Sequence, residues 1–323
     1  ILTSMKENLI GIDIGGTKCA VSYGCKEGDS LVVVDKDRFA TTEVNETIEH
    51  ICQSVSKMLE KHQLNKDNPK GIGISCGGPL SSTKGIVMSP PNLIGWDNIP
   101  IVKIIEDLTH IPTHLQNDAN ACALAEYKFG AGRGSRNMVF LTLGTGLGAG
   151  IVIDGKLYSG ANDNAGEVGH IRLAEYGPVG YGKRGSFEGF TSGGGIAQIA
   201  SVLVKEQWQQ GNKVSWCELG SLDKITTQLV AEQASKGDAV AKEAFDIAAE
   251  YLGRGLSIII DTLNPEVIVI GSIFTRCEHL LREGMQKVID REALPCASKV
   301  CEVRTAALDE QIGDFAALSV AAI

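Results

Sequence analysis

The sequence has no hydrophobic run long enough to cross a membrane. Its most apolar stretch, residues 256–263, is interrupted by Ser257, Asp261 and Thr262. A membrane-spanning helix needs about 20 apolar residues in succession. The segment before Met5 does not have the pattern of a signal peptide either. We therefore expect no membrane partner and a cytoplasmic location.

Concentrated positive charge is also missing. The 323 residues include 30 Lys and Arg against 39 Asp and Glu, which gives a formal net charge of −9. A nucleic-acid-binding surface needs a basic face that neutralises phosphates. The composition therefore argues against a nucleic-acid partner.

Paired cysteines are the third absence. The nine cysteines are scattered and form no C-x-x-C pair; Cys296 and Cys301 are the closest two. Several others, such as Cys76 and Cys122, lie in apolar contexts typical of buried thiols. This pattern favours a reducing compartment over a disulfide framework or a zinc site.

What the sequence does contain is a strand-turn-strand pattern that occurs twice. The chain is long enough for two domains of roughly 150 residues each. Residues 9–23 predict a strand, a glycine-rich turn and a return strand, and residues 137–158 repeat the same order. Helical and strand-like segments alternate elsewhere. The repetition indicates two related α/β domains.

Both glycine-rich turns imitate better-known nucleotide motifs. Residues 144–149 fit the letters of the dinucleotide fingerprint, but that motif must open a helix, whereas residues 151–155 predict a hairpin. The first turn nearly spells a P-loop, but Thr17 stands where a Lys should follow Gly16. Glycine-rich β-turns still present backbone N–H groups to phosphate oxygens. Either turn alone would be consistent with a plain tight hairpin; the matched pair favours phosphate binding.

Asn117 and Asp118 lie where an apolar run, residues 111–115, gives way to an amphipathic helix at 119–129. A carboxylate at such a junction is held by helix N–H groups and could accept a proton from a substrate hydroxyl. The alternative is that Asp118 is only a helix cap.

A further polar cluster contains Glu167, His170 and Glu188. Together with Asn117 and Asp118, these side chains supply acceptors, an amide and an imidazole that suit the hydroxyls of a sugar. The alternatives here are a structural histidine and solvated carboxylates.

These motifs together resemble the ROK family of sugar kinases and sugar-responsive repressors, within the actin-like ATPase superfamily. The resemblance covers essentially the whole chain. It rests on the two phosphate motifs at 13–18 and 144–150, the sugar-side loop at 91–96, the catalytic segment at 117–121, the sugar segment at 167–170 with its end at 188–193, and the adenosine-side turn at 269–272. That last turn has one glycine, Gly271, where relatives often have two or three.

The resemblance implies an α/β fold of two actin-like ATPase (ribonuclease-H-like) domains with an interdomain cleft. The small N-terminal domain would comprise residues 1–118 plus 311–323, and the large C-terminal domain residues 119–310. Since dimers are common in the family, a homodimer is expected.

The resemblance also implies the activity, namely ATP-dependent phosphorylation of a hexose primary hydroxyl, with Mg²⁺ and with Asp118 as the catalytic base. Glucose is the first candidate, and N-acetylmannosamine and N-acetylglucosamine stay open. The implied substrate-binding residues are Gly78, Asn92, Asn117, Asp118, Glu167, His170 and Glu188. The implied ATP-binding residues are Asp13, Gly15, Gly16, Thr17, Lys18, Gly144, Thr145, Gly146 and Gly271, with Asp13 near Mg²⁺.

One departure from the family stands out. At residues 179–188, relatives carry the pattern C-x-C-G-x-x-G-C-x-E, which ends at the position of Glu188. A histidine at the position of His170 completes a structural zinc site with the three cysteines. This chain has Val179, Tyr181 and Ser186 at the three cysteine positions, and His170 alone cannot hold a zinc ion that needs about four ligands. We therefore predict no zinc, and a loop stabilised by packing of Tyr181 and Phe187 or by a partner subunit.

The rival function is a non-catalytic sugar-sensing regulator. Family repressors carry a DNA-binding helix-turn-helix ahead of the first phosphate motif, and here that motif begins within the first fifteen residues. This position, the acidic charge, the intact Asp118 and both phosphate turns favour the kinase.

Overall fold

The computed structural model describes residues 6–323, which form two compact units. The first unit contains the described residues up to Arg136, together with Gly150–Ala165 and Ala307–Ile323. The second contains Asn137–Ala149 and Gly166–Ala306. Within residues 6–323, no helix is both long and apolar enough to cross a membrane.

The first unit is built on a five-stranded mixed sheet with the order β3-β2-β1-β4-β7. Strands β1, β2 and β3 pair antiparallel, as the predicted strand-turn-strand requires, whereas β4 and β7 run parallel to β1. The strands are β1 (Glu7–Ile14), β2 (Lys18–Glu27), β3 (Ser30–Ala40), β4 (Gly71–Cys76) and β7 (Thr113–Asn117). Every residue of β4 is buried, because helices cover both faces of the sheet.

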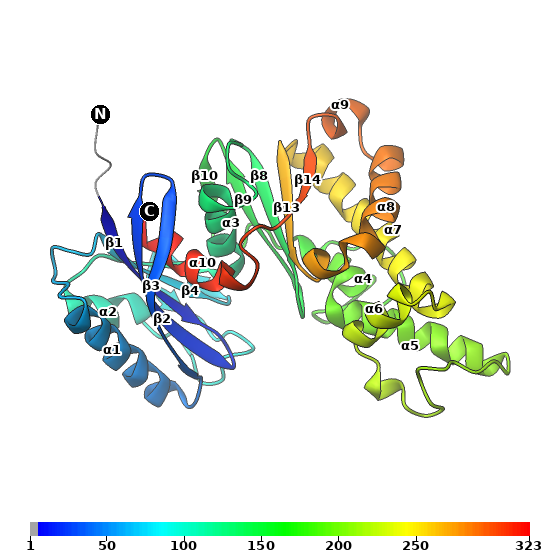
Figure 1. Cartoon of the computed structure of the whole chain (residues 1–323), viewed down its shortest axis with the longest axis horizontal. Helices are drawn as coiled ribbons and strands as arrows, with labels where there is room; N and C mark the ends of the chain where they lie inside the picture. The colour runs from blue at the N-terminus through cyan, green and yellow to red at the C-terminus, as the bar shows by residue number, and fades with distance from the viewer. Residues whose placement is uncertain (1–5) are drawn as a thin grey trace. The chain divides into compact units, whose positions relative to one another are not determined.

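Two layers of helices cover this sheet (Figure 1). Helices α1 (Val44–Lys61) and α2 (Ile101–Thr109) contribute to one apolar cluster, which includes Ile51, Val55 and Ile105. Helices α3 (Asp118–Phe129) and α10 (Ile312–Ala321) contribute to separate clusters, which include Leu124, Leu318 and Val320. Leu9 of β1 lies in the same cluster as Leu318 of α10, so the two ends of the described chain pack together. Short strands β5 (Leu80–Ser81), β6 (Ile86–Val87) and β10 (Lys156–Tyr158) and the 3₁₀ turn η3 (Asp309–Gln311) complete the unit.

Glycine lets α10 lie directly on the strands. A Cβ atom at Gly73 in β4 would stand 2.1 Å from the carbonyl oxygen of Ala317. Any side chain there would push the helix off the sheet, since real Cβ contacts are longer than 3 Å. The reason for the glycines of β4 is thus visible only in the packing.

The second unit has a sheet in which β9, β8, β13 and β14 are neighbours in that order. Strands β8 and β14 are parallel to β13. The strands are β8 (Met138–Leu143), β9 (Leu147–Ile153, of which the first three residues belong to this unit), β13 (Val267–Ser272) and β14 (Glu302–Thr305). Its helices are α4 (Phe187–Thr191), α5 (Gly193–Gln209), α6 (Thr227–Ser235), α7 (Ala239–Leu263), α8 (Ile273–Glu292) and α9 (Pro295–Ser298), with 3₁₀ turns η1 (Val168–His170) and η2 (Leu222–Lys224) and a small hairpin of β11 (Val179–Gly180) and β12 (Lys183–Arg184).

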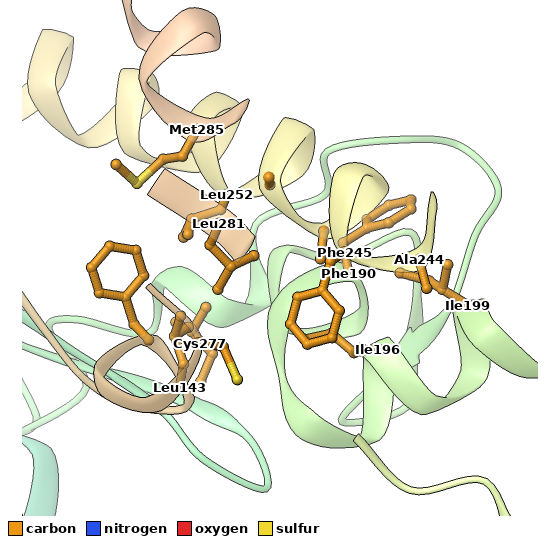
Figure 2. Close-up of a cluster of buried hydrophobic side chains, with 14 of the residues drawn as sticks. Leu143, Phe190, Ile196, Ile199, Ala244, Phe245, Leu252, Cys277, Leu281 and Met285 are labelled. Carbon is orange, nitrogen blue, oxygen red and sulfur yellow. The ribbon is translucent and has the colours of Figure 1, made fainter. Parts of the chain in front are cut away.

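Helix α7 is the centre of the second unit. The Asp238 carboxylate caps its first turn by accepting from the N–H of Ala241 at 2.9 Å. Its buried side chains, among them Phe245 and Leu252, pack with Phe190 and Ile196 on one side and Leu281 and Met285 on the other (Figure 2). Apolar side chains on nearly every turn therefore explain why one face of this 25-residue helix is buried along its length.

The compact units divide the chain differently from the boundaries expected at 118/119 and 310/311. Helix α3, which the sequence analysis placed in the C-terminal domain, lies in the first unit because Ala121 and Leu124 pack with Ala316 and Val320 of α10. The last crossing between the units falls after Ala306, ahead of the expected position at 310/311.

Candidate functional site

Three parallel strands of the first unit end at one edge of its sheet. The register pairs Asp13 of β1 with Ser75 of β4, and Cys76 of β4 with Asn117 of β7. The loops that follow these strand ends carry most of the site residues predicted for this unit. Sequence-distant motifs therefore meet at this edge.

The first glycine turn is closed by its own backbone. The N–H of Gly15 donates to the carbonyl of Lys18 at 3.2 Å, and the Thr41 hydroxyl donates to the carbonyl of Gly15 at 2.6 Å. Thr17 and Lys18 are exposed. A Cβ at Gly16 would lie 2.5 Å from the carbonyl oxygen of Asn92, so the loop at 91–96 rests on this turn.

The predicted sugar-side residues of the first unit converge on the same place. A Cβ at Gly77 would lie 3.6 Å from the Asn92 Oδ1 and 3.9 Å from the Asp118 Oδ2. A Cβ at Gly78 would lie 3.4 Å from the Asn117 Nδ2. The structure thus brings Gly78, Asn92, Asn117 and Asp118 together.

Asn117, not Asp118, caps helix α3. Its Oδ1 accepts from the N–H groups of Ala119 at 3.0 Å and Asn120 at 3.4 Å. Asp118 is the first helical residue, and its Oδ1 accepts a bond from Ala119 at 2.8 Å. The cap explanation for Asp118 is therefore unnecessary, since its neighbour fills that role. The predicted role of Asn117 in substrate binding becomes more specific. Its Oδ1 is occupied by the N–H groups of the helix, so its Nδ2 is the group left to donate to a substrate.

The pKa values of two carboxylates at this edge, Asp13 and Asp118, are both raised. Burial is the main cause that raises the pKa of Asp13 from 3.8 to about 7, followed by the carboxylates of Asp118 and Asp314; Lys36 and Arg38 oppose the shift. The pKa of Asp118 is also raised, mainly because protein atoms displace water around it, although its side chain retains exposed surface. Asp13 supplies a half-buried carboxylate, and carboxylate oxygens are ligands that Mg²⁺ prefers, so Asp13 fits the expected metal.

Asp13 leads to a prediction for pH dependence in the absence of metal and nucleotide. Because the folded chain keeps the Asp13 proton up to about pH 7 and the unfolded chain loses it near 3.8, the contribution of Asp13 to stability falls as pH rises across this window. Asp13→Asn removes this contribution. Urea unfolding at pH 5.5 and 8.5 should therefore show that the variant gains stability relative to wild type at the higher pH. The same difference in free energy of unfolding between the two proteins at both pH values would contradict the raised pKa of Asp13.

In the second unit, Glu188 holds the second glycine turn. The turn is closed by the Gly144 N–H donating to the Gly146 carbonyl at 3.0 Å, and the Gly144 carbonyl accepts from Gly193 at 2.9 Å. The Glu188 Oε2 accepts from the N–H of Leu147 at 2.9 Å. No sequence pattern indicates this contact, which joins a predicted sugar-binding residue to a predicted phosphate-binding turn.

The sugar segment of the second unit lies beside Glu188. A Cβ at Gly169 would stand 3.4 Å from the Glu188 Cβ. Glu167 and His170 flank this glycine on η1, and both are exposed. The His170 ring meets the Tyr181 ring edge-on with 6.5 Å between centroids. The structure thus brings Glu167, His170 and Glu188 into one region, next to the turn that contains Gly144, Thr145 and Gly146.

Gly271 itself is enclosed by the sheet, where a Cβ would meet Ala306 and Phe140 at 3.4 to 3.6 Å. The next residue, Ser272, has φ +60° and ψ −114°, a backbone conformation costly for a residue with a side chain. Its hydroxyl lies 3.2 Å from that of Thr142, and a Cβ at Gly144 would lie 4.0 Å from the Ser272 Oγ. The sequence analysis missed both hydroxyls; a serine at an otherwise glycine-like turn is the signal that could have found them.

A cavity of about 850 Å³ lies in the second unit beside this turn. Its walls come from α6 and from the first turns of α8, and they include Thr227, Lys236, Arg276, Cys277 and His279. Thr227 also donates to the Gly193 carbonyl at 2.5 Å, which links the cavity wall to the chain that closes the glycine turn. Such a volume suits a small organic ligand. The sequence analysis did not identify this cavity.

The segment that lacks the family's cysteines is held by packing and backbone hydrogen bonds. Phe187 is fully buried against α7, where a Cβ at Gly255 would lie 2.3 Å from its ring. The expectation that Tyr181 also packs is wrong, because its side chain is 74% exposed. Among residues 6–323 no group of three or more His, Cys, Asp or Glu side chains is arranged to hold a metal.

The absence of zinc stays a prediction with a direct measurement. Elemental analysis of the purified protein should give well under one zinc per chain, because the cysteine positions offer neither thiolate nor imidazole. Chelation should leave the melting temperature unchanged, and activity should return when Mg²⁺ is restored. One tightly bound zinc per chain, lost together with activity, would contradict this reading.

Comparison with known proteins identifies the ROK family over almost the full length of this chain. The family model described as ROK family matches residues 9–322. The chain is 33% identical over 309 residues to a glucokinase of Halalkalibacterium halodurans, covering 94% of this chain and 92% of that protein. It is 31% identical over 291 residues to a xylose repressor of Caldicellulosiruptor bescii, covering 88% and 71%.

The fold is shared with solved structures. A ROK family glucokinase from Streptomyces griseus, in complex with glucose and AMPPNP, matches with a TM-score of 0.74 and 28% identity, covering 98% of this chain and 99% of that one. The expected α/β fold of the actin-like ATPase type is thereby confirmed. Sequence motifs, unit architecture and relatives agree: the chain belongs to the ROK family.

Proposed function

We propose that this chain catalyses ATP-dependent phosphorylation of the primary hydroxyl of a hexose, with Asp118 as general base and glucose as the first candidate sugar. The observation that carries the proposal is the state of Asp118. Asn117 takes over the helix cap, and the pKa of Asp118 is raised by the loss of surrounding water. A base is most effective when its pKa lies nearer the working pH than that of a free carboxylate.

The other residues divide between the two reactants. The backbone turns at Gly15–Gly16 and Gly144–Gly146, with Thr17, Lys18 and Thr145, are assigned to the phosphates of ATP. The cavity beside Ser272 is assigned to the rest of the nucleotide, and the amide of Asn117 with Glu167, His170 and Glu188 to the sugar hydroxyls. Mg²⁺, when bound near Asp13, would spread the charge of the phosphates. The relatives named glucokinase support these assignments.

In this mechanism Asp118 accepts the proton of the primary hydroxyl as the hydroxyl oxygen attacks the terminal phosphorus of ATP. The bond from that phosphorus to the bridging oxygen breaks, and ADP leaves. Positioning and charge stabilisation account for most of phosphoryl-transfer catalysis. The Ala119 N–H bond to Asp118 Oδ1 fixes the carboxylate and leaves Oδ2, the atom nearer Gly77, to receive the proton. Unlike a mobile surface carboxylate, Asp118 therefore needs little reorganisation before reaction.

The sugar-binding assignment leads to a separate prediction. Glu188→Gln and His170→Ala should each raise the KM for sugar by about tenfold or more, since a hydrogen bond to a charged group contributes about 1.5–3 kcal/mol. In Glu188→Gln the side chain keeps an oxygen that can accept from Leu147, so the fold should be intact. Initial rates over a range of sugar concentrations measure the effect. Unchanged sugar saturation in both variants would remove these residues from the pocket.

Choice among sugars needs its own experiment. A panel of glucose, other hexoses, N-acetylmannosamine and N-acetylglucosamine should give one preferred substrate by kcat/KM, with glucose expected first. A clear preference for an N-acetylhexosamine would keep the kinase assignment and overturn the choice of sugar. Because one relative is named as a repressor, a sensor without activity is the second candidate; it predicts sugar binding with no ADP release.

A further inference from the structure

The segment 177–188 is tied together by its backbone although it has no cysteine ligands. The N–H of Gly185 donates to the Pro178 carbonyl at 2.9 Å, and the Gly185 carbonyl accepts from Leu173 and Ala174 at 2.8 and 3.1 Å. Phe187 donates to the carbonyl of Ile171 at 2.8 Å. The first of these bonds closes the small hairpin of β11 and β12, and the others join its end to residues 171–174. They involve no atom of the Glu188 side chain.

One buried hydroxyl connects the hairpin to the helix that carries Glu188. Ser186 is fully buried and caps α4. Its Oγ accepts from the N–H of Gly189 at 3.1 Å and donates to the carbonyl of Gly180 at 3.4 Å. A hydroxyl has one donor and two acceptor lone pairs, so it satisfies both groups together. The two linked groups lie close to Glu188, because a Cβ at Gly180 would stand 2.5 Å from the nitrogen of Gly189 and 2.8 Å from the Cβ of Glu188.

The backbone of β11, which Ser186 holds through Gly180, packs closely against the Cβ and Cγ of Glu188, the stem of that side chain. A Cβ at Gly180 would stand 2.8 Å from both the Cβ and the Cγ of Glu188, which shows how closely β11 approaches. The far end of the stem is fixed by the bond from Leu147 to Oε2. A shift of β11 would free the stem and change the direction of the carboxylate.

A side-chain amide holds the outer end of β11. The Gln198 Oε1 accepts from the Val179 N–H at 2.9 Å, and its Nε2 donates to the Val179 carbonyl at 2.9 Å. Gln198 thus pairs with Val179 as a neighbouring strand would. Both partners are exposed, so its contribution is smaller than that of the buried hydroxyl.

We propose that Ser186 and Gln198 are positioning residues for sugar recognition: their hydrogen bonds hold β11 against the stem of Glu188 and so set the direction of its carboxylate. The inference rests on the proposed function, in which Glu188 binds sugar hydroxyls. It predicts a defect confined to the sugar, because the glycine turn retains its own closing bond between Gly144 and Gly146.

Ser186→Ala should raise the KM for sugar by about tenfold, the effect of one misdirected charged hydrogen bond. The affinity for ADP measured by calorimetry should stay within about twofold of wild type, and kcat should fall much less than the KM rises. Gln198→Ala should raise the KM for sugar by a smaller factor. The control is Asp238→Ala, which removes a comparable helix cap from α7 and should lower the melting temperature without changing the KM for sugar.

The outcomes separate the inference from the function on which it rests. If wild type releases no ADP with any sugar, the proposed function fails. If wild type is active and Ser186→Ala leaves the KM for sugar unchanged, or if Asp238→Ala raises it equally, the positioning role fails and the function stands. Should Ser186→Ala not fold, Gln198→Ala decides: an unchanged KM for sugar in that variant overturns the proposal.

Discussion

Asp118→Asn is expected to fold normally, to bind sugar and ATP, and to lose about 10²-fold or more in turnover. A positioned general base contributes about 10² to 10⁴ to a rate, and an amide cannot take its place. The replacement keeps an oxygen that can accept the N–H of Ala119, the bond that Asp118 makes in the structure. The helix cap is unaffected because it belongs to Asn117.

Single-turnover rates and equilibrium sugar binding would measure the two parts of this expectation separately. The matched control is Asp107→Asn, which alters an exposed carboxylate of α2 paired with Lys103 and should leave turnover unchanged. If Asp118→Asn has near-normal turnover, Asp118 is not the base. The role left for the Asp118 carboxylate is then the local hydrogen bond that it accepts from Ala119 in α3.

Phe187→Ala is expected to produce the largest loss of stability. The ring is fully buried between α4 and α7, and removing a buried Phe costs about 3–5 kcal/mol. For a domain of this size that corresponds to a fall in melting temperature on the order of 10 °C. The prediction follows from the replacement of metal ligands by packing in the segment 177–188.

Tyr181→Ala is the matched control within the same segment. Its ring is 74% exposed, so its loss should change the free energy of unfolding by no more than about 0.5 kcal/mol. Thermal unfolding of both variants, with and without chelator, is the measurement. Equal losses in the two variants would show that the segment depends on something other than the Phe187 contact.

Local patterns explain why much of the first unit could be predicted. The strand, glycine-rich turn and return strand predicted over residues 9–23 follow from residue spacing and glycine placement, and β1, the turn and β2 are present. Helix α3 shows where such reasoning stops. Its alanines are small and apolar on several faces, so the sequence did not reveal that α10 would pack on them and bring α3 into the first unit.

In the candidate site, too, part could be predicted from the sequence and part depends on how the chain packs. The sequence identified Asn117 and Asp118 as a pair, but either residue type can cap a helix, and only the structure distinguishes the cap from the carboxylate left for chemistry. The bond from Leu147 to Glu188 joins residues 41 apart in the chain. Nothing in the spacing of either motif indicates such a contact, because it depends on where α4 packs against the start of β9.

The measurement that tests the central claim most directly is ADP release by the purified chain with ATP, Mg²⁺ and glucose, together with identification of the phosphorylated sugar. We predict ADP release that depends on sugar, equimolar with a hexose phosphorylated on its primary hydroxyl, and reduced by about 10²-fold or more in Asp118→Asn. Sugar binding without ADP release for any hexose or N-acetylhexosamine would contradict the account and identify the chain as a sensor.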